Sequence, residues 1–204
     1  MKKITVVTPC YNEEDNVEEV YRQTRAVMDS VEGISYRHLF IDNRSTDATA
    51  DILRRLAAED SNVQVILNAR NFGPIRSPFH GLMQAGGDAV IGLAADLQDP
   101  PSLMREFIAH WRAGAKAVIG VKPSAKESRI MFSIRRLYYS MVTRIADVEL
   151  IRNFTGFGLF DRQVIEAMRR IDDPYPYMRG LISEIGCDTV QVPYIQPRRV
   201  RGVS

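Results

Sequence analysis

Two carboxylates and an amide lie close together in residues 96–101 (DLQDPP), and these side chains are well suited to metal binding or catalysis. Asp96 and Asp99 follow an apolar run at residues 88–92 that is typical of a short buried strand, and two prolines then favour the start of a helix. Open α/β sheets bind ligands just beyond the carboxyl ends of their strands. Carboxylates at that place favour a hard divalent cation and, through it, a diphosphate. The simpler alternative is an aspartate that only caps the helix.

Two further polar clusters follow predicted strands. Residues 4–8 form an apolar, β-branched run that is followed by PCYNEE, and the strand predicted at residues 37–42 runs into DNRSTD. Asn12 could cap the next helix, and residues 45–47 could cap the one after it. No GxGxxG or GxxxxGK[ST] pattern follows the first strand, so the dinucleotide-fingerprint and P-loop interpretations lose their main support.

The predicted elements would bring these clusters to one edge of a sheet. Helical spacing over residues 17–28 and 52–56, a strand at residues 63–67 and a helix ending near residue 85 give a regular alternation of strands and helices. That alternation predicts an α/β fold with a mostly parallel, Rossmann-like sheet flanked by helices and joined by right-handed crossovers. A fifth strand is predicted at residues 114–121.

The pattern changes after residue 121. Residues 127–146 form a long predicted helix with an apolar stripe and with four arginines on or beside its polar side, namely Arg129, Arg135, Arg136 and Arg144. This pattern favours either a packed helix with a solvated basic face or a helix that rests on an anionic membrane surface. Further elements are predicted as a strand at residues 153–160, helices at 162–170 and 175–185, and a strand at 189–194.

Composition excludes several classes of function. The 204 residues fit one domain, and a net charge of +2 gives no support for a nucleic-acid partner. Cys10 and Cys187 lack the spacing of a zinc site or a disulfide framework, which suits a reducing compartment. No run of about 18 apolar residues occurs, so we expect no membrane-spanning helix. The composition leaves a homo-oligomer open.

Four stretches together resemble the family 2 glycosyltransferases of the GT-A fold, in particular bacterial relatives of dolichol-phosphate-mannose synthase and the polyprenyl-phosphate glucosyltransferases. They are residues 7–14, 41–47, 71–73 and 96–101, each at the start of a loop after a predicted strand. The resemblance covers almost the whole chain. It implies a single GT-A catalytic domain over residues 1–204, with a nucleotide-sugar-binding half at 1–121 and an acceptor half at 122–204.

The resemblance also implies roles for individual residues. Pro9, Tyr11 and Glu13 match the loop that holds the nucleoside, with Asn12 among them. Asp42, followed by Asn43, matches the acid that accepts a hydrogen bond from the base, normally uracil. Asp96 matches the ligand of a Mg²⁺ or Mn²⁺ ion, with Asp99 as its catalytic neighbour and Gln98 beside the diphosphate. The basic end of the chain resembles a loop that closes over the donor phosphates, through Arg198, Arg199, Arg201 and Ser204.

The chain departs from the family pattern at three places. Ala94 stands where an aspartate is frequent, so Asp96 would hold the metal with fewer carboxylates. Asn43 and Arg44 replace the more usual acid and glycine. Gly156 and Gly158 stand where relatives that act on lipid phosphate have an aspartate and an arginine, which leaves the general base and the class of acceptor open.

The activity implied is an inverting transfer of a sugar from a nucleotide-sugar, expected to be UDP-linked, to a polyprenyl phosphate, a lipid-linked glycan or a sugar. The expected place is the inner, cytoplasmic face of a bacterial membrane, in the synthesis of cell-envelope polysaccharide. One alternative is a sugar nucleotidyltransferase, which would require a phosphate loop rich in glycine and lysine where residues 9–14 have none. The other is a nucleotide- or membrane-binding module without catalytic activity.

Overall fold

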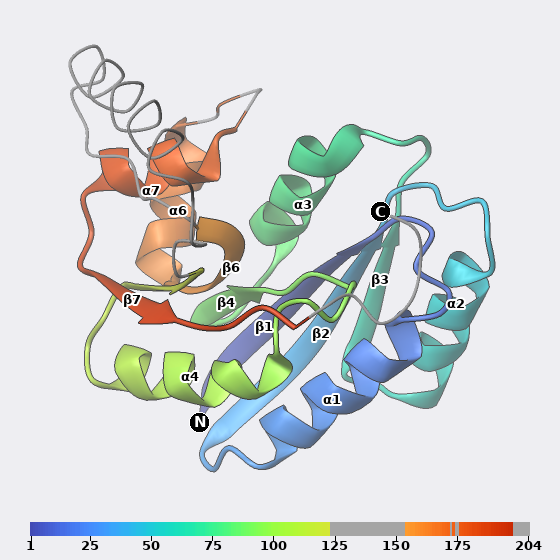
Figure 1. Cartoon of the computed structure of the whole chain (residues 1–204), viewed down its shortest axis with the longest axis horizontal. Coiled ribbons are helices and arrows are strands. Elements are labelled where there is room, and N and C mark those ends of the chain that lie inside the picture. The colour runs from blue at the N-terminus through green and yellow to red at the C-terminus, as the bar shows by residue number, and fades with distance from the viewer. Residues whose placement is uncertain (123–153, 172, 174–175, 198–204) are drawn as a thin grey trace, which may run out of the picture.

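The computed structural model describes residues 1–122, 154–171, 173 and 176–197. Within these residues, seven strands form one sheet in the order β3-β2-β1-β4-β6-β5-β7, with helices on both of its faces (Figure 1). The predicted α/β class, with a mostly parallel sheet flanked by helices, is confirmed. The long helix predicted at residues 127–146 lies outside the described residues.

The first four strands are parallel to one another. They are β1 (Lys2–Cys10), β2 (Ile34–Asp42), β3 (Val63–Leu67) and β4 (Ala89–Gly92). Strand β1 pairs with both β2 and β4, while β3 pairs with β2. The strand order therefore reverses between β1 and β4, which is the point at which open α/β sheets place their ligands.

The connecting helices cover the two faces of the sheet. Helices α1 (Val17–Asp29) and α2 (Thr49–Glu59) pack on one face, together with α4 (Met104–Arg112), which follows the 3₁₀ turn Pro101–Leu103. Helix α3 (Gly73–Gln84) packs on the other face with α6 (Arg162–Ile171) and α7 (Met178–Ile185). Burying the apolar side of each helix against the sheet is the main source of stability for such a layered fold.

The last three strands make the sheet mixed. Strand β6 (Phe154–Asp161) runs antiparallel to β4 and to β5 (Ala117–Val121), and β7 (Thr189–Pro193) runs parallel to β5. Because β6 lies between β4 and β5, the part of the chain after residue 121 completes the same sheet as the part before it. No helix among the described residues is long and apolar enough to cross a membrane.

Several predicted boundaries need correction. The helix predicted from residue 175 begins at Met178, and the strand predicted from residue 114 begins at Ala117. Gly114 instead has a φ of +114° in the turn that follows α4, a conformation that glycine adopts without a steric cost.

Candidate active site

The loops after β1 and β2 are joined to each other by hydrogen bonds. The Asn12 amide donates to Ser45 Oγ (3.0 Å), and Asn12 Oδ1 accepts from the Thr46 amide (2.8 Å). The Glu13 amide donates to Thr49 Oγ1 (2.9 Å). Asn12 has a φ of +53°, which asparagine tolerates better than most residues. The two loops therefore form one joined rim at the strand ends.

The prediction that Asn12 caps α1 is wrong. The helix begins at Val17, and its cap position is occupied by Asn16. The Asn12 side chain is instead used by the second loop. The prediction that residues 45–47 cap α2 also needs correction, because the cap position is Ala48 and no side-chain capping bond forms there. Asp47, one residue earlier, accepts a hydrogen bond from the backbone amide of Thr49 (3.0 Å), the first residue of α2.

Asp42 lies at the end of β2 and is only 3% exposed. Its carboxylate accepts hydrogen bonds from Ser45 Oγ (2.5 Å) and from the Ser45 amide (3.2 Å). Two carboxylate oxygens accept about four hydrogen bonds in all, so acceptor capacity remains for a ligand. Asp42 also pairs in the sheet with Cys10, directly before the loop that contains Tyr11 and Glu13.

Asn43 holds the loop between β3 and α3. Its Nδ2 donates to Asn71 Oδ1 (2.8 Å), and its Oδ1 accepts from the Phe72 amide (2.9 Å) and from Asn68 Nδ2 (3.2 Å). A direct contact between Asn43 and a nucleotide stays a prediction. The contacts observed explain how the uncharged asparagine positions the residues just before α3.

The loop after β4 carries Asp96 on a strained backbone. Leu97 has a φ of +58°, which costs a residue with a Cβ on the order of 1–2 kcal/mol. Asp96 Oδ1 accepts from the Gln98 amide (3.1 Å), and Gln98 Oε1 accepts from Gln196 Nε2 (2.7 Å). The second bond ties this loop to the segment after β7, so a distant part of the chain helps to hold it in place.

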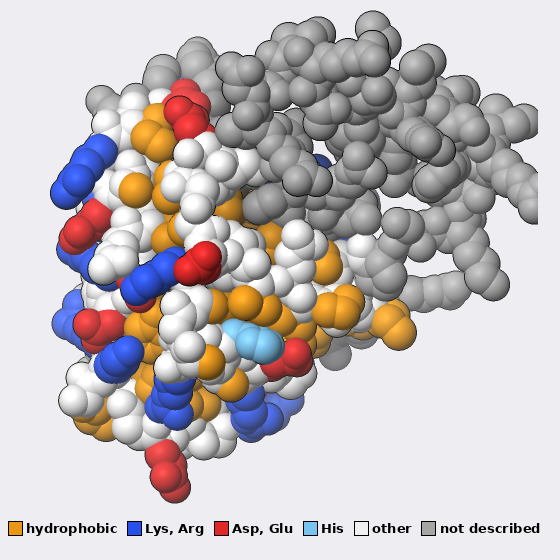
Figure 2. Space-filling view, turned by 90° about the vertical axis from the view of Figure 1, so that its left-hand side faces the viewer, with side chains coloured by type: hydrophobic (Ala, Val, Ile, Leu, Met, Phe, Trp, Pro, Cys, Tyr) orange, Lys and Arg blue, Asp and Glu red, His pale blue; other side chains and the backbone are white. Residues whose placement is uncertain are grey.

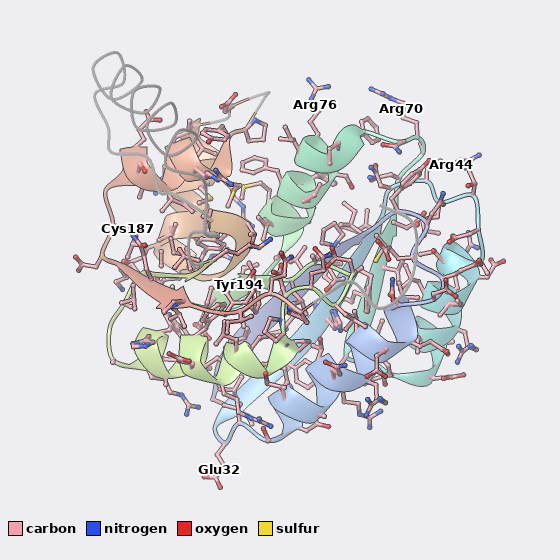
Figure 3. All side chains as sticks on the ribbon, in the orientation of Figure 1. Glu32, Arg44, Arg70, Arg76, Cys187 and Tyr194 are labelled. Carbon is pink, nitrogen blue, oxygen red and sulfur yellow. The ribbon has the colours of Figure 1, made fainter. Side chains whose placement is uncertain are left out.

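Asp99 is only 4% exposed and accepts a hydrogen bond from the hydroxyl of Tyr194. That hydroxyl also lies 3.2 Å from Thr155 Oγ1, and Figure 3 shows Tyr194 in the middle of the molecule. Burial raises the pKa of Asp99 above its ordinary value, although the Tyr194 hydrogen bond acts in the opposite direction. The helix-capping alternative fails for Asp99, because the cap position of the 3₁₀ turn is Pro100 and the Asp99 carboxylate meets Tyr194 instead.

A cavity of about 390 Å³ adjoins the ends of β1 and β4. Pro9, Ala94 and Asp99 line its inner side, and Gly156 of β6 forms part of its floor. Its outer walls are side chains of α3 and of the start of α7. This volume is within the roughly 300–1,000 Å³ typical of small-molecule sites. The loops of the predicted nucleotide site therefore border a second, mostly apolar space.

The described residues fit a magnesium or manganese ion that a substrate shares. No three His, Cys, Asp or Glu side chains gather into a metal site within the described part of the chain. Mg²⁺, however, is often held by one or two carboxylates together with the phosphates of its substrate. Asp96, which is partly exposed at the end of β4, offers such a carboxylate.

The structure does not show every predicted residue. Arg198, Arg199 and Arg201 lie outside the described residues, as do the four arginines of residues 127–146. It brings Tyr194, Thr155, Gln196 and Arg179 to the site, which the sequence reasoning missed. Tyr194 is separated from Asp99 by 95 positions, so no local pattern indicates their contact. On the face shown in Figure 2, Lys and Arg side chains alternate with Asp and Glu, and no patch of one sign forms among the side chains coloured there.

Comparison with known sequences gives a consistent set of relatives. Residues 5–169 match the family model described as Glycosyl transferase family 2. An uncharacterized glycosyltransferase, YkcC of Bacillus subtilis, is 33% identical over 199 residues, which are 97% of this chain and 61% of that protein. A bactoprenol glucosyl transferase of Shigella phage SfV is 32% identical over 203 residues, 99% of this chain and 66% of that protein. The chain thus spans less than two thirds of the length of these relatives.

Solved structures share the fold at lower sequence identity. A mannosyltransferase of Pyrobaculum calidifontis in complex with GDP-Man and Mn²⁺ aligns with a TM-score of 0.66 and 20% identity, over 98% of this chain and 57% of that one. Glucosyl-3-phosphoglycerate synthase of Mycobacterium tuberculosis, in complex with Mn²⁺, UDP and its product, aligns with a TM-score of 0.59 and 20% identity, over 98% of this chain and 73% of that one.

Proposed function

The chain belongs to glycosyl transferase family 2, and from this membership we propose that it is the GT-A catalytic part of an inverting hexosyltransferase. It transfers a sugar from a UDP-sugar to a polyprenyl phosphate or a lipid-linked glycan. The observation that carries the proposal is the meeting, at the ends of β1 and β4, of a rim of carboxylates with a mostly apolar cavity. A polar nucleotide-sugar would bind at the carboxylates, and the apolar chain of a lipid acceptor would bind in the adjoining cavity.

The donor nucleotide lies on the joined rim after β1 and β2. The ring of Tyr11, which is 47% exposed, packs against the base, with Pro9 and Asn12 beside it. Glu13 binds the ribose hydroxyls, and Asp42 accepts a hydrogen bond from uracil. Asn43 contributes indirectly, by holding the loop before α3 in position.

The diphosphate lies over the loop after β4, next to Gln98. Asp96 would hold Mg²⁺ or Mn²⁺ there, and such an ion stabilises the charge that grows on the leaving diphosphate. Structures of relatives that contain Mn²⁺ with a nucleotide support this choice of ion. Arg198, Arg199 and Arg201 add charge-assisted hydrogen bonds to the same phosphates.

The reaction is a single displacement. An acceptor oxygen forms a bond with the anomeric carbon of the sugar while the bond from that carbon to the diphosphate oxygen breaks, so the configuration inverts. A phosphate acceptor is already ionised and needs little help from a base, whereas a sugar hydroxyl needs a base. For a hydroxyl acceptor, Asp99 would be the general base, because it is the one carboxylate among the described residues that line the cavity.

The acceptor places the reaction at a membrane. Relatives named bactoprenol glucosyl transferases support a polyprenyl lipid, which the chain would meet at the cytoplasmic face of a bacterial membrane during synthesis of the cell envelope. Contact of residues 127–146 with anionic lipid and a homo-oligomeric state belong to the same proposal.

The test is turnover with a panel of UDP- and GDP-sugars, with Mn²⁺, and with polyprenyl phosphate in detergent or a free sugar as acceptor. We expect UDP release that depends on polyprenyl phosphate, and a glycolipid product of inverted configuration. In a parallel assay with UTP and a sugar 1-phosphate, formation of a sugar nucleotide with release of pyrophosphate would instead identify a nucleotidyltransferase. Tight binding of UDP without turnover on any acceptor would identify a binding module and overturn the proposal.

A further inference from the structure

The cavity beside Asp99 contains an arginine that the proposed reaction has not used. Arg179 and Asp99 are the charged side chains among the described residues that line it. The remaining lining is mostly apolar and includes Ile75 and Phe79 of α3 and Tyr177 before α7. Ile75 is 59% exposed, so the apolar wall reaches the surface.

Arg179 has no partner among the described residues, whereas other arginines on this face are engaged. Arg169 donates from Nε to the carbonyl oxygen of Met83 (3.0 Å), and Arg162 Nε donates to Glu166 Oε1 (2.7 Å). Asp99, the opposite charge in the cavity, already accepts from Tyr194. A guanidinium beside an apolar wall is costly unless an anion meets it, and its planar fork matches the oxygens of a phosphate.

Two glycines of β6, at the floor of the cavity and beyond it, differ in the space around them. Gly156 has a φ of +102°, and a Cβ added there would meet no atom within 4 Å, so the floor leaves space for a ligand. A Cβ at Gly158 would lie 2.8 Å from the carbonyl oxygen of Val118, so β6 has no room for a side chain at that position. The cavity thus has an open floor and a cation on one wall.

The occupant must carry both an anionic and an apolar part. Inorganic phosphate would leave the apolar wall exposed, and a neutral lipid would leave Arg179 unpaired. The cavity also borders Pro9 and Ala94 at the ends of β1 and β4, where the donor sugar is expected. A phosphate held by Arg179 would therefore share one cavity with the expected position of the donor sugar.

We propose that Arg179 binds the phosphate of a polyprenyl phosphate acceptor, and that Ile75, Phe79 and Tyr177 seat its first isoprene units. This inference rests on the proposed function for the identity of the reaction. The ionised phosphate oxygen forms the bond to the anomeric carbon, and the UDP oxygen leaves with the electron pair of the broken bond. No proton has to be removed in this step.

Binding of farnesyl phosphate, measured by calorimetry on the full chain, tests the inference without depending on turnover. We expect the variant Arg179→Gln to bind it about 10- to 100-fold more weakly, the loss that follows from removing one charge-assisted hydrogen-bonding partner. Arg179→Lys should restore part of the affinity. Ile75→Asp should also weaken the binding of farnesyl phosphate, while the affinity for UDP stays unchanged in all three variants.

The matched control is Arg54→Gln, which removes an exposed arginine from α2 on the opposite face of the sheet and should change neither affinity. Equal binding of farnesol and farnesyl phosphate, or unchanged binding by Arg179→Gln, would overturn the inference even if sugar transfer occurs. Loss of farnesyl phosphate binding in Arg179→Gln, in a chain that transfers no sugar, would overturn only the proposed function.

Discussion

Asp42 ends one parallel strand and Asp96 follows another, yet their surroundings differ. Asp42 is buried and accepts from the hydroxyl and the amide of Ser45. Asp96 is partly exposed and accepts from one amide in its own loop. A buried carboxylate suits hydrogen-bonded recognition of a base, whereas an exposed one can share a cation with a substrate.

At the residue scale, Asp96→Ala should abolish metal-dependent turnover and leave the fold intact. The side chain makes one local hydrogen bond among the described residues, so its removal costs little stability. Turnover over a range of Mn²⁺ concentrations and a thermal unfolding curve measure the two effects, with Asp51→Ala on the exposed side of α2 as control. Near-normal activity at saturating Mn²⁺ would refute the assignment of the metal ligand.

Asp42→Ala should weaken UDP binding by about 1–3 kcal/mol, the cost of leaving a hydrogen-bond partner unpaired. Calorimetric titration with UDP measures it. Ser45→Ala is the matched control, because it removes the hydroxyl that donates to Asp42 and keeps the carboxylate. If both variants bind UDP like the original chain, Asp42 does not recognise the base.

At the scale of elements, β7 and the residues after it stabilise the loop that follows β4. Tyr194 donates to Asp99, and Gln196 donates to Gln98, so the segment after β7 holds the residue predicted to lie beside the diphosphate and its neighbour Asp99. The same segment leads to the basic end of the chain. Packing of β7 on β5 is therefore expected to influence the donor site as well as stability.

Tyr194→Phe should lower the free energy of unfolding by about 1.5–3 kcal/mol at pH 7, because ionised Asp99 loses its donor. Burial raises the pKa of Asp99 in the folded protein above the ordinary value of 3.8. The contribution of Asp99 to stability therefore falls as the pH rises from the ordinary pKa through the raised pKa of the folded state. Removing the Tyr194 hydroxyl removes an interaction that lowers this pKa. The cost of keeping Asp99 ionised and buried at neutral pH therefore increases.

The difference in unfolding free energy between the original chain and Tyr194→Phe should therefore be larger at pH 7 than near pH 4, because protonation of Asp99 at low pH removes the charge that the Tyr194 hydroxyl stabilises. Urea unfolding at both pH values measures it, and the other carboxylates cancel in the comparison. A difference that is the same at both values would mean that the Tyr194 hydroxyl does not act through the charge of Asp99.

Arg201→Ala should raise the Michaelis constant for the donor and lower turnover. Charge on the diphosphate grows in the transition state, so a cation that meets it contributes more there than in the ground state. Initial rates over a range of UDP-sugar concentrations separate the two effects, and Arg22→Ala on the exposed side of α1 serves as control. Unchanged kinetic constants would exclude Arg201 from phosphate binding.

At the scale of the whole molecule, attachment to a membrane is expected to be reversible and sensitive to salt. Anionic lipid contributes about 1 kcal/mol for each arginine near its surface, so Arg129, Arg135, Arg136 and Arg144 supply roughly 4 kcal/mol at most. Salt screens this attraction. Flotation with anionic liposomes should therefore occur at low salt, decline at high salt and disappear when these arginines are changed to Gln. Equal flotation of the variant would exclude residues 127–146 as the contact.

The sequence by itself determined the elements that depend on local pattern. Apolar runs at residues 4–8 and 88–92 predicted β1 and β4, because a strand buried on both faces needs such residues. Strands were also predicted at residues 37–42 and 63–67, where β2 and β3 are found. Alternation with amphipathic helices then predicted a mostly parallel sheet, and short polar clusters marked the loops at its carboxyl edge. These features follow from chemistry within about ten neighbouring residues.

Only the tertiary structure decided which distant side chains meet. It inserted β6 antiparallel between β4 and β5, joined Asn12 to the second loop instead of to α1, and placed Tyr194 against Asp99. It also brought Arg179 to the same cavity as Gly156, although no local pattern connects the two residues. Such contacts depend on how the faces of the sheet and helices pack, and that packing is set by the whole core, so no short stretch of sequence encodes them.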